Sequence, residues 1–142
     1  MNKITSFKNE HRWLSNMAAC EIIYGDLVFK STEAFYQAMK TLDADERIKF
    51  QGYDGQTSKR EGRKLILRDD WHQIKDDVMK FALKKKFNQE PFKSLLINTG
   101  DAEIIEGNYW HDNYWGSCTC SKCGNNGLNT LGKMIMDIRA NL

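Results

Sequence analysis

Two short β-prone runs near the amino terminus are the first clear pattern in the chain. Ile22–Tyr24 and Leu27–Phe29 flank the dipeptide Gly25-Asp26. Short apolar runs on either side of a Gly/Asp pair are typical of two antiparallel strands joined by a tight turn. The pattern therefore predicts a β-hairpin over residues 22–29.

A helical period follows this hairpin. Ser31 is a favoured N-cap residue, and the spacing predicts a helix from about Thr32 to Leu42. Its apolar stripe consists of Phe35, Ala38, Met39 and Leu42. On another face Glu33, Gln37 and Lys40 lie at positions i, i+4 and i+7, which brings their side chains together.

Further periodic segments predict helices along most of the remaining chain. We expect them over residues 43–51, over 57–67, over 71–87 with Asp69 or Asp70 as the cap, around Leu95-Leu96 after Pro91, and from Leu128 onward with Asn129 or Thr130 as the cap. Ile104 and Ile105 predict a brief strand. Together these elements indicate a helix-dominated α+β fold with a few short strands, forming one compact domain over residues 1–142.

The stretch from Gly107 to Gly127 has no hydrophobic period. It is rich in Asn, Gly, Tyr, Trp and Cys, and a long unpatterned loop inside a compact domain is often functional. The segment 108–116, NYWHDNYWG, holds four aromatic residues around Asp112. Aromatic rings can stack on a planar base, which favours a binding pocket, whereas an Asp that caps a turn in a surface loop is the alternative.

Composition and charge exclude several classes of protein. The 142 residues are 41% hydrophobic and 28% charged, with a net charge of +2, which gives no strong reason to expect nonspecific binding to nucleic acid. The longest apolar runs fall short of the roughly 20 residues of a membrane helix, and the first residues show no signal-peptide core. We therefore expect no membrane association and a cytoplasmic location. Lys80, Lys84, Lys85 and Lys86 cluster near one helix end, where cations suit the helix dipole, and a phosphate-attracting patch is the alternative interpretation.

Three cysteines form the motif Cys118-x-Cys120-x-x-Cys123, and the fourth is Cys20. Reduced thiols in a loop are the interpretation that we favour, so no metal ligand and no cofactor is assigned. The alternative is a structural zinc site, for which His111 or Cys20 would have to supply the fourth ligand. The common phosphate-loop, dinucleotide, nucleophile-elbow and zinc-protease motifs are absent from the sequence.

The order and spacing of several segments resemble one protein family, the NADAR domain, also called YbiA-like. The matching segments are 14–16 (LSN), 31–40 (STEAFYQAMK), 62–63, 71–87, 96–100, 112–116 (DNYWG) and 127–133 (GLNTLGK). The resemblance extends over nearly the whole chain. Known members are N-glycosidases, some acting on phosphoribosylamino-pyrimidine intermediates of riboflavin synthesis and others removing ADP-ribose from guanine.

The resemblance implies an active site and a reaction. Glu33, Trp71, Asp112 and Trp115 match the family's active-site positions, and of these we expect Glu33 and Asp112 to be catalytic and Trp71 and Trp115 to enclose the base. In addition, we expect Asn16, Lys40 and Arg63 to bind hydroxyls or phosphate of the substrate. The expected partner is a ribosylated or ADP-ribosylated small molecule or nucleobase, with ADP-ribosylated nucleic acid as a further class. A module that binds NAD or ADP-ribose without turnover is the competing hypothesis, and a zinc-stabilised interaction protein is a third.

Overall fold

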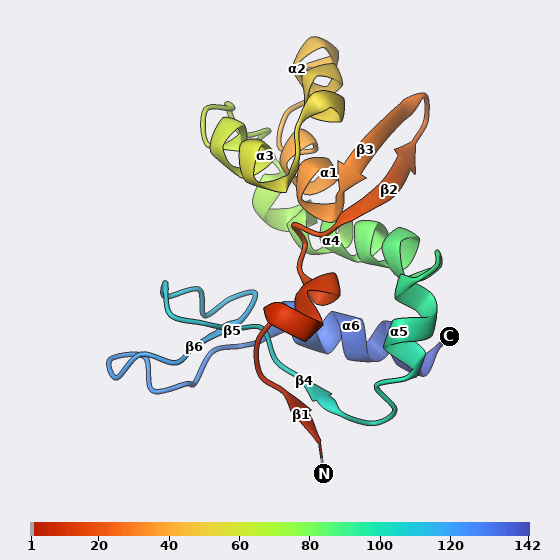
Figure 1. The fold of residues 1–142 in the computed structure, drawn as a ribbon. Helices are drawn as coiled ribbons and strands as arrows, with labels where there is room; N and C mark the ends of the chain where they lie inside the picture. Colours follow the sequence, from red (N-terminus) through yellow and green to blue (C-terminus); the bar gives the residue numbers. More distant parts are fainter. Residues whose placement is uncertain (1) are drawn as a thin grey trace. The chain divides into compact units, whose positions relative to one another are not determined.

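A computed structural model of the chain describes residues 2–142, which group into two compact units. One unit comprises Asn16–Gln89, and the other combines the residues up to Ser15 with Glu90–Leu142. The prediction of a single domain over 1–142 stays a prediction. Figure 1 labels the helices and strands of both units.

The predicted hairpin opens the unit of residues 16–89. Strand β2 (Ala19–Tyr24) pairs antiparallel with β3 (Leu27–Ser31), and Ile22 lies opposite Phe29. Gly25 has a φ of 60°, the left-handed conformation that this two-residue turn requires. Ile22 and Phe29 are fully buried on one face of the ribbon, whereas Ile23 and Val28 are exposed on the other. The hairpin prediction is therefore confirmed.

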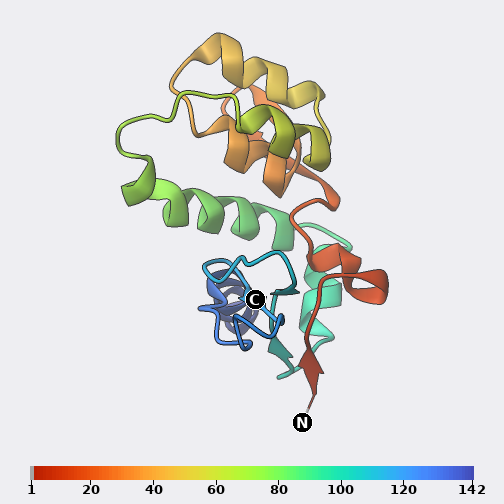
Figure 2. The ribbon, with the colours of Figure 1, turned by 90° about the vertical axis from the view of Figure 1, so that its left-hand side faces the viewer.

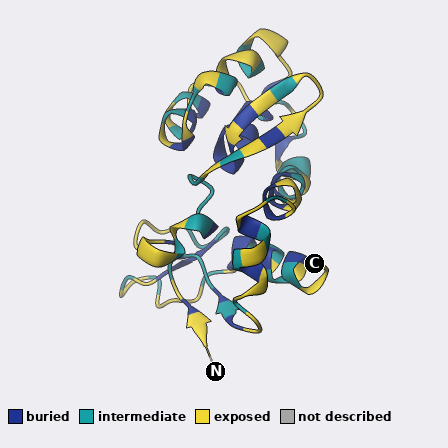
Figure 3. Ribbon diagram, turned by 45° about the vertical axis from the view of Figure 1, so that its right-hand side comes forward, coloured by how far each residue is buried: buried dark blue, intermediate teal, exposed yellow. Residues whose placement is uncertain are grey.

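Helix α1 (Thr32–Ala38) follows β3 without a connecting loop and is the core of this unit. The Ser31 hydroxyl accepts a hydrogen bond from Ala34 N at 3.0 Å, which confirms the predicted cap. All residues of the helix are buried (Figure 3), because α1 packs against β3 and against the helices α3 and α4. The helix ends earlier than predicted, and Leu42 is 68% exposed, because Asp43 already caps the next helix.

The other helices of the unit are α2 (Ala44–Lys49), the 3-10 turn η2 (Phe50–Gly52), α3 (Gly55–Gly62) and α4 (Trp71–Phe87). Helix α4 has the predicted bounds. Helix α3 begins earlier than predicted because Asp54 caps it, and it ends at Gly62 rather than at residue 67. Asp70 precedes α4 but its side chain does not cap the helix, since its carboxylate pairs with the Arg68 guanidinium at 2.6 and 3.2 Å.

Lys86 differs from the other lysines at the end of α4 because its side chain is buried. Lys84 and Lys85 are exposed, but Lys86 is 0% exposed on the inner face of α4, next to Phe87. Burial lowers the pKa of the Lys86 amine to about 7, and the nearby Cys20 thiol partly opposes this shift. The apolar stripe of α4 therefore carries an ionisable side chain that a helical period of apolar residues alone does not reveal.

The second unit is held together by pairings between distant segments. Strand β1 (Lys3–Ile4) pairs in parallel with β4 (Glu103–Ile104), and β5 (Gly107–Asn108) pairs in parallel with β6 (Ser117–Cys118). Its helices are the 3-10 helix η1 (Asn9–Leu14), α5 (Phe92–Ile97) and α6 (Thr130–Ala140). Helix α6, seen end-on in Figure 2, packs against β4.

Asn129 organises the start of α6 in an unexpected way. Asn129 adopts a left-handed φ of 54°, and its side chain makes no hydrogen bond that caps α6. The predicted side-chain cap is therefore not formed. Its amide instead donates to Ile104 O at 2.9 Å and accepts from Glu106 N at 3.0 Å. The side chain thereby ties the helix to the end of β4.

The helix-dominated α+β fold with a few short strands is confirmed. Among residues 2–142, every helix lacks the length or the apolar character that a membrane crossing requires.

Candidate functional site

Glu33 lies near the start of α1 and is 8% exposed. Gln37, one turn later, donates a hydrogen bond from Nε2 to Glu33 Oε2 at 2.6 Å. The backbone N–H of Glu33 donates to Asn16 O at 3.0 Å, which fixes the helix start to the segment before the hairpin. The carboxylate is therefore buried and held in one orientation.

The electrostatic environment of Glu33 is a balance of opposing effects. Burial raises the pKa of its carboxyl group above the ordinary value of a glutamate. The hydrogen bond from Gln37 and the positive charges of Lys59 and Lys40 act in the opposite direction. A buried acid with a raised pKa and nearby cations is a common feature of catalytic sites.

Two lysines, Lys59 and Lys40, act electrostatically on this acid, and Lys40 belongs to the predicted set. Burial lowers the pKa of Lys40, the charges of Arg63 and Lys59 lower it further, and Glu33 opposes them. Lys40 thus interacts electrostatically with both Glu33 and Arg63, while Arg63 itself is exposed. Lys59 is absent from the predicted set, although its position one turn before Arg63 at the end of α3 is a usable signal.

Gly62 explains how α3 approaches α1 so closely. A Cβ at this position would overlap the side-chain oxygen of Gln37. The absence of a side chain at Gly62 therefore leaves room for the amide that holds Glu33.

Asn16 lies beside the start of α1. Its amide nitrogen is 3.7 Å from Met79 Sδ on α4, while its Oδ1 is buried and makes no hydrogen bond within the described part of the protein. Gln37 Oε1 and Ser58 Oγ are buried without a partner in the same sense. Buried polar atoms normally have partners, so these three atoms are groups that a polar ligand can satisfy.

Trp71 begins α4 and is 4% exposed. Its ring meets the Tyr36 ring edge to face, with the centroids 5.0 Å apart. The Lys40 amine lies 5.6 Å from the same Tyr36 ring. Tyr36 therefore connects Trp71 to the cations around Glu33, a role that its position in the sequence does not indicate.

Asp112 and Trp115 belong to the other unit, within the segment 108–116. Asp112 Oδ1 accepts hydrogen bonds from the backbone N–H groups of Tyr114 and Trp115 at 3.1 and 3.0 Å. The Trp115 ring meets the Tyr114 ring edge to face at 5.0 Å. Asp112 therefore closes a turn that orients Trp115. This agrees with the alternative interpretation of this loop, in which the aspartate caps a turn.

Four described residues of the same unit form a cluster of side chains suited to hold a metal ion. His111, Cys118, Cys120 and Cys123 place one potential ligand atom each within 4.8 Å of the others.

Fold and site together define a small helix-dominated α+β protein whose central helix carries a buried carboxylate near two lysine side chains. The chain belongs to the NADAR domain family, which matches it over residues 4–142.

Similar proteins carry informative names. N-glycosidase YbiA of Shigella boydii is 32% identical over 141 residues, covering 96% of this chain and 85% of that protein. A riboflavin biosynthesis protein of Vibrio vulnificus is 32% identical over 93% of this chain, which spans 36% of that longer protein. The NMR structure of Escherichia coli YbiA is 30% identical, with a TM-score of 0.80 over 98% of this chain and 82% of that one.

These similarities bear on three predictions, namely the family, the fold and the enzyme class. The family resemblance and the YbiA-like fold are confirmed. The relatives named N-glycosidases are hydrolases of N-glycosyl bonds, at about 30% identity over most of the chain, in agreement with the predicted enzyme class.

Proposed function

We propose that the protein is an N-glycosidase that hydrolyses the bond between ribose C1′ and the nitrogen of a base or base-like group. The buried Glu33 carboxylate, oriented by Gln37 and surrounded by cations, carries this proposal. The N-glycosidase names of similar proteins support the reaction class.

Glu33 acts as the general base of the reaction. In the proposed step water adds to C1′ and forms a C–O bond, while the C–N bond breaks and its electron pair stays on the nitrogen. The carboxylate takes a proton from the attacking water and later returns it to solvent, while the leaving nitrogen takes a proton from solvent or from the second acid. A pKa raised toward the working pH suits this role, because the group must be ionised to accept the proton and basic enough to hold it. As positive charge develops on the sugar, the carboxylate also stabilises it.

The substrate class is a phosphoribosylamino-pyrimidine. Lys40 supplies positive charge beside Glu33, and the exposed Arg63 lies near enough to act on Lys40. An arginine side chain binds a phosphate through paired hydrogen bonds. Similar proteins named for riboflavin biosynthesis agree with such a substrate. The buried Oδ1 of Asn16 is suited to accept a hydrogen bond from a ribose hydroxyl.

The remaining predicted residues have supporting roles in this proposal. Trp71 is too buried to offer a free face, so it encloses the substrate indirectly by supporting Tyr36. Trp115 is half-buried and is retained as a stacking residue. Asp112 is retained as the second acid on the family resemblance alone, since its Oδ1 already closes the turn before Trp115.

A substrate panel tests the function. The protein is incubated with a phosphoribosylamino-pyrimidine and with ADP-ribosylated guanosine, and mass spectrometry identifies the released base and sugar. We expect release of the pyrimidine and ribose 5-phosphate, with at least a roughly 100-fold loss in Glu33→Gln. Glu61→Gln, a change to a half-buried acid on α3 that pairs with Lys64, is the matched control.

Each other outcome has a distinct meaning. Turnover of the ADP-ribosylated guanosine alone would replace the proposed substrate and keep the bond type. Calorimetric binding of ADP-ribose without any released product would favour the binding module. Equal rates for the wild type and Glu33→Gln would remove Glu33 from the chemistry.

A further inference from the structure

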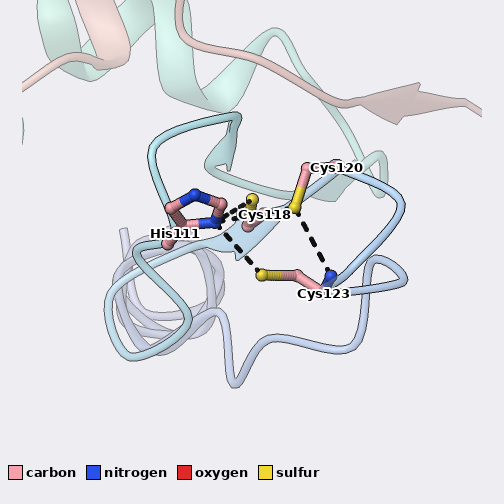
Figure 4. Close-up of side chains that lie close together, drawn as sticks. All are labelled: His111, Cys118, Cys120 and Cys123. Carbon is pink, nitrogen blue, oxygen red and sulfur yellow. Dashed lines mark hydrogen bonds between the residues drawn. The ribbon is translucent and has the colours of Figure 1, made fainter.

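The side chains of His111, Cys118, Cys120 and Cys123 converge on one point (Figure 4). The His111 Nδ1 atom lies 3.6, 3.5 and 3.4 Å from the Sγ atoms of the three cysteines in chain order. All four cysteines of the chain are free thiols. One imidazole nitrogen thus faces three sulfur atoms at nearly equal distances.

These three distances match the nitrogen-to-sulfur edges of a zinc tetrahedron. With Zn–S bonds of about 2.3 Å and Zn–N bonds of about 2.0–2.1 Å, a tetrahedral angle separates nitrogen from sulfur by roughly 3.6 Å. All three observed distances agree with this value within 0.2 Å. A hydrogen-bonded thiol and imidazole would require only one such contact, so three equal contacts indicate a shared central ligand.

The backbone around the cysteines is arranged to present sulfur atoms. The N–H of Cys123 donates to Cys120 Sγ at 3.4 Å, and Gly124 N donates to Cys120 O at 2.9 Å. Gly124 adopts a φ of 64°, which reverses the chain directly after the Cys-x-x-Cys pair.

A second set of hydrogen bonds fixes Cys118. Its N–H donates to Asn113 Oδ1 at 2.9 Å, and its carbonyl accepts from Asn125 N at 3.0 Å. Cys118 is fully buried in β6, while Cys120 and Cys123 are half-buried. The sulfur positions are therefore set by the loop itself.

We propose that His111, Cys118, Cys120 and Cys123 bind one Zn²⁺ ion in a closed, four-coordinate structural site. The sequence alone leaves either His111 or Cys20 as the fourth ligand, and in this proposal the fourth ligand is His111. Three thiolates and one imidazole are a common donor set of structural zinc, and four protein ligands leave no position for a substrate.

The ion stabilises the segment 107–127, which has only the two-residue strands β5 and β6 of its own. His111 directly precedes Asp112, and Cys118 follows Trp115 by three residues, so the zinc ligands bracket the turn that orients Trp115. Because the site is structural, its presence does not depend on the proposed glycosidase activity.

Metal analysis of the full chain, purified under reducing conditions, tests the proposal. We expect about one zinc per chain. After zinc is removed by a chelator, titration with Co²⁺ should give the visible bands of a tetrahedral ion together with sulfur-to-cobalt charge transfer. Cys120→Ser and His111→Ala should each weaken zinc affinity by more than about 100-fold. Cys20→Ser and His72→Ala are the matched controls and should retain the metal.

Failure of the reduced wild-type protein to bind Zn²⁺ or Co²⁺ would overturn the proposal, as would an octahedral cobalt spectrum. Full zinc retention by Cys120→Ser and His111→Ala would do the same. If these variants do not fold, the cobalt spectrum of the wild type decides the question. Every readout is metal binding rather than turnover, so the result is separate from that of the substrate panel.

Discussion

Gln37 Nε2 donates a 2.6 Å hydrogen bond to the carboxylate of Glu33, one turn before it on α1. This bond lowers the Glu33 pKa, in opposition to the larger effect of burial. In Gln37→Leu the pKa should therefore rise further, because the ionised form loses a donor. The acidic limb of the kcat/KM profile should move to higher pH, as measured by initial rates across the pH range. Gln73→Leu, on the exposed side of α4, is the control, and an unmoved limb in Gln37→Leu would refute the coupling.

Glu33→Gln should stabilise the fold at neutral pH while removing activity. The pKa of Glu33 is raised in the folded state, so its ionisation above that pKa favours unfolding, and stability falls as the pH rises through it. The uncharged amide in the variant lacks this effect. Thermal unfolding should show a higher Tm for the variant at pH 7.5 and a smaller difference at pH 5. A Tm below that of the wild type at both pH values would contradict the assigned burial cost.

Gly62→Ala tests whether the Gln37 side chain needs its present position. The added Cβ overlaps Gln37 Oε1, so the amide must move and its bond to Glu33 is lost or lengthened. We expect kcat/KM to fall about tenfold or more, since small displacements of a catalytic group are costly. Gly52→Ala is the matched control, because a Cβ at Gly52 meets no atom within 4 Å. Comparable rates for both variants would argue against a positioning role for Gln37.

Asp112→Asn separates the two roles of Asp112. An asparagine keeps the Oδ1 acceptor that closes the turn at Tyr114 and Trp115 but removes the charge. If Asp112 is the second acid, kcat should fall about 100-fold while Tm stays within a few degrees. Asp112→Ala removes both features and should lower Tm as well. Wild-type activity in Asp112→Asn would show that Asp112 only closes the turn and is not the second acid.

Lys86→Met should flatten the dependence of stability on alkaline pH. The pKa of Lys86 is about 7 in the folded protein, whereas an unfolded lysine titrates near 10.4. Between these values unfolding takes up a proton, so wild-type stability should rise with pH, by up to about 2 kcal/mol from pH 7.5 to 9. Denaturant titrations at both pH values measure this slope. Lys84→Met, at an exposed neighbouring position, should keep the wild-type slope.

Local patterns predict the elements that local interactions determine. The hairpin with its Gly25 turn, the Ser31 cap and the bounds of α4 follow from residues within a few positions of one another. The end of α1 and the start of α3 do not follow, because Asp43 caps the next helix, α2, and Asp54 caps α3 earlier than predicted. A helical period shows which face is apolar but does not show where a competing cap ends the helix.

Pairings between distant segments are beyond the reach of local sequence patterns. The two-residue ladders β1–β4 and β5–β6 contain too few residues to show any alternation. Glu33 resembles an ordinary surface acid at a helix start, and only the packing of α1 shows that it is buried. The burial of Lys86 on the inner face of α4 cannot be predicted from the sequence either, because a lysine in an apolar period normally keeps its amine in solvent.

The direct passage from β3 at Ser31 to α1 at Thr32 has a consequence for how this region can vary. Each residue added to a helix rotates the following side chains by about 100°. With no loop to absorb an extra residue, one insertion between Phe29 and Glu33 would turn the acid away from the cations of α3. The spacing of this junction is therefore constrained as strongly as its chemistry, and length changes in functional relatives should fall elsewhere, for example in the Gly25-Asp26 turn.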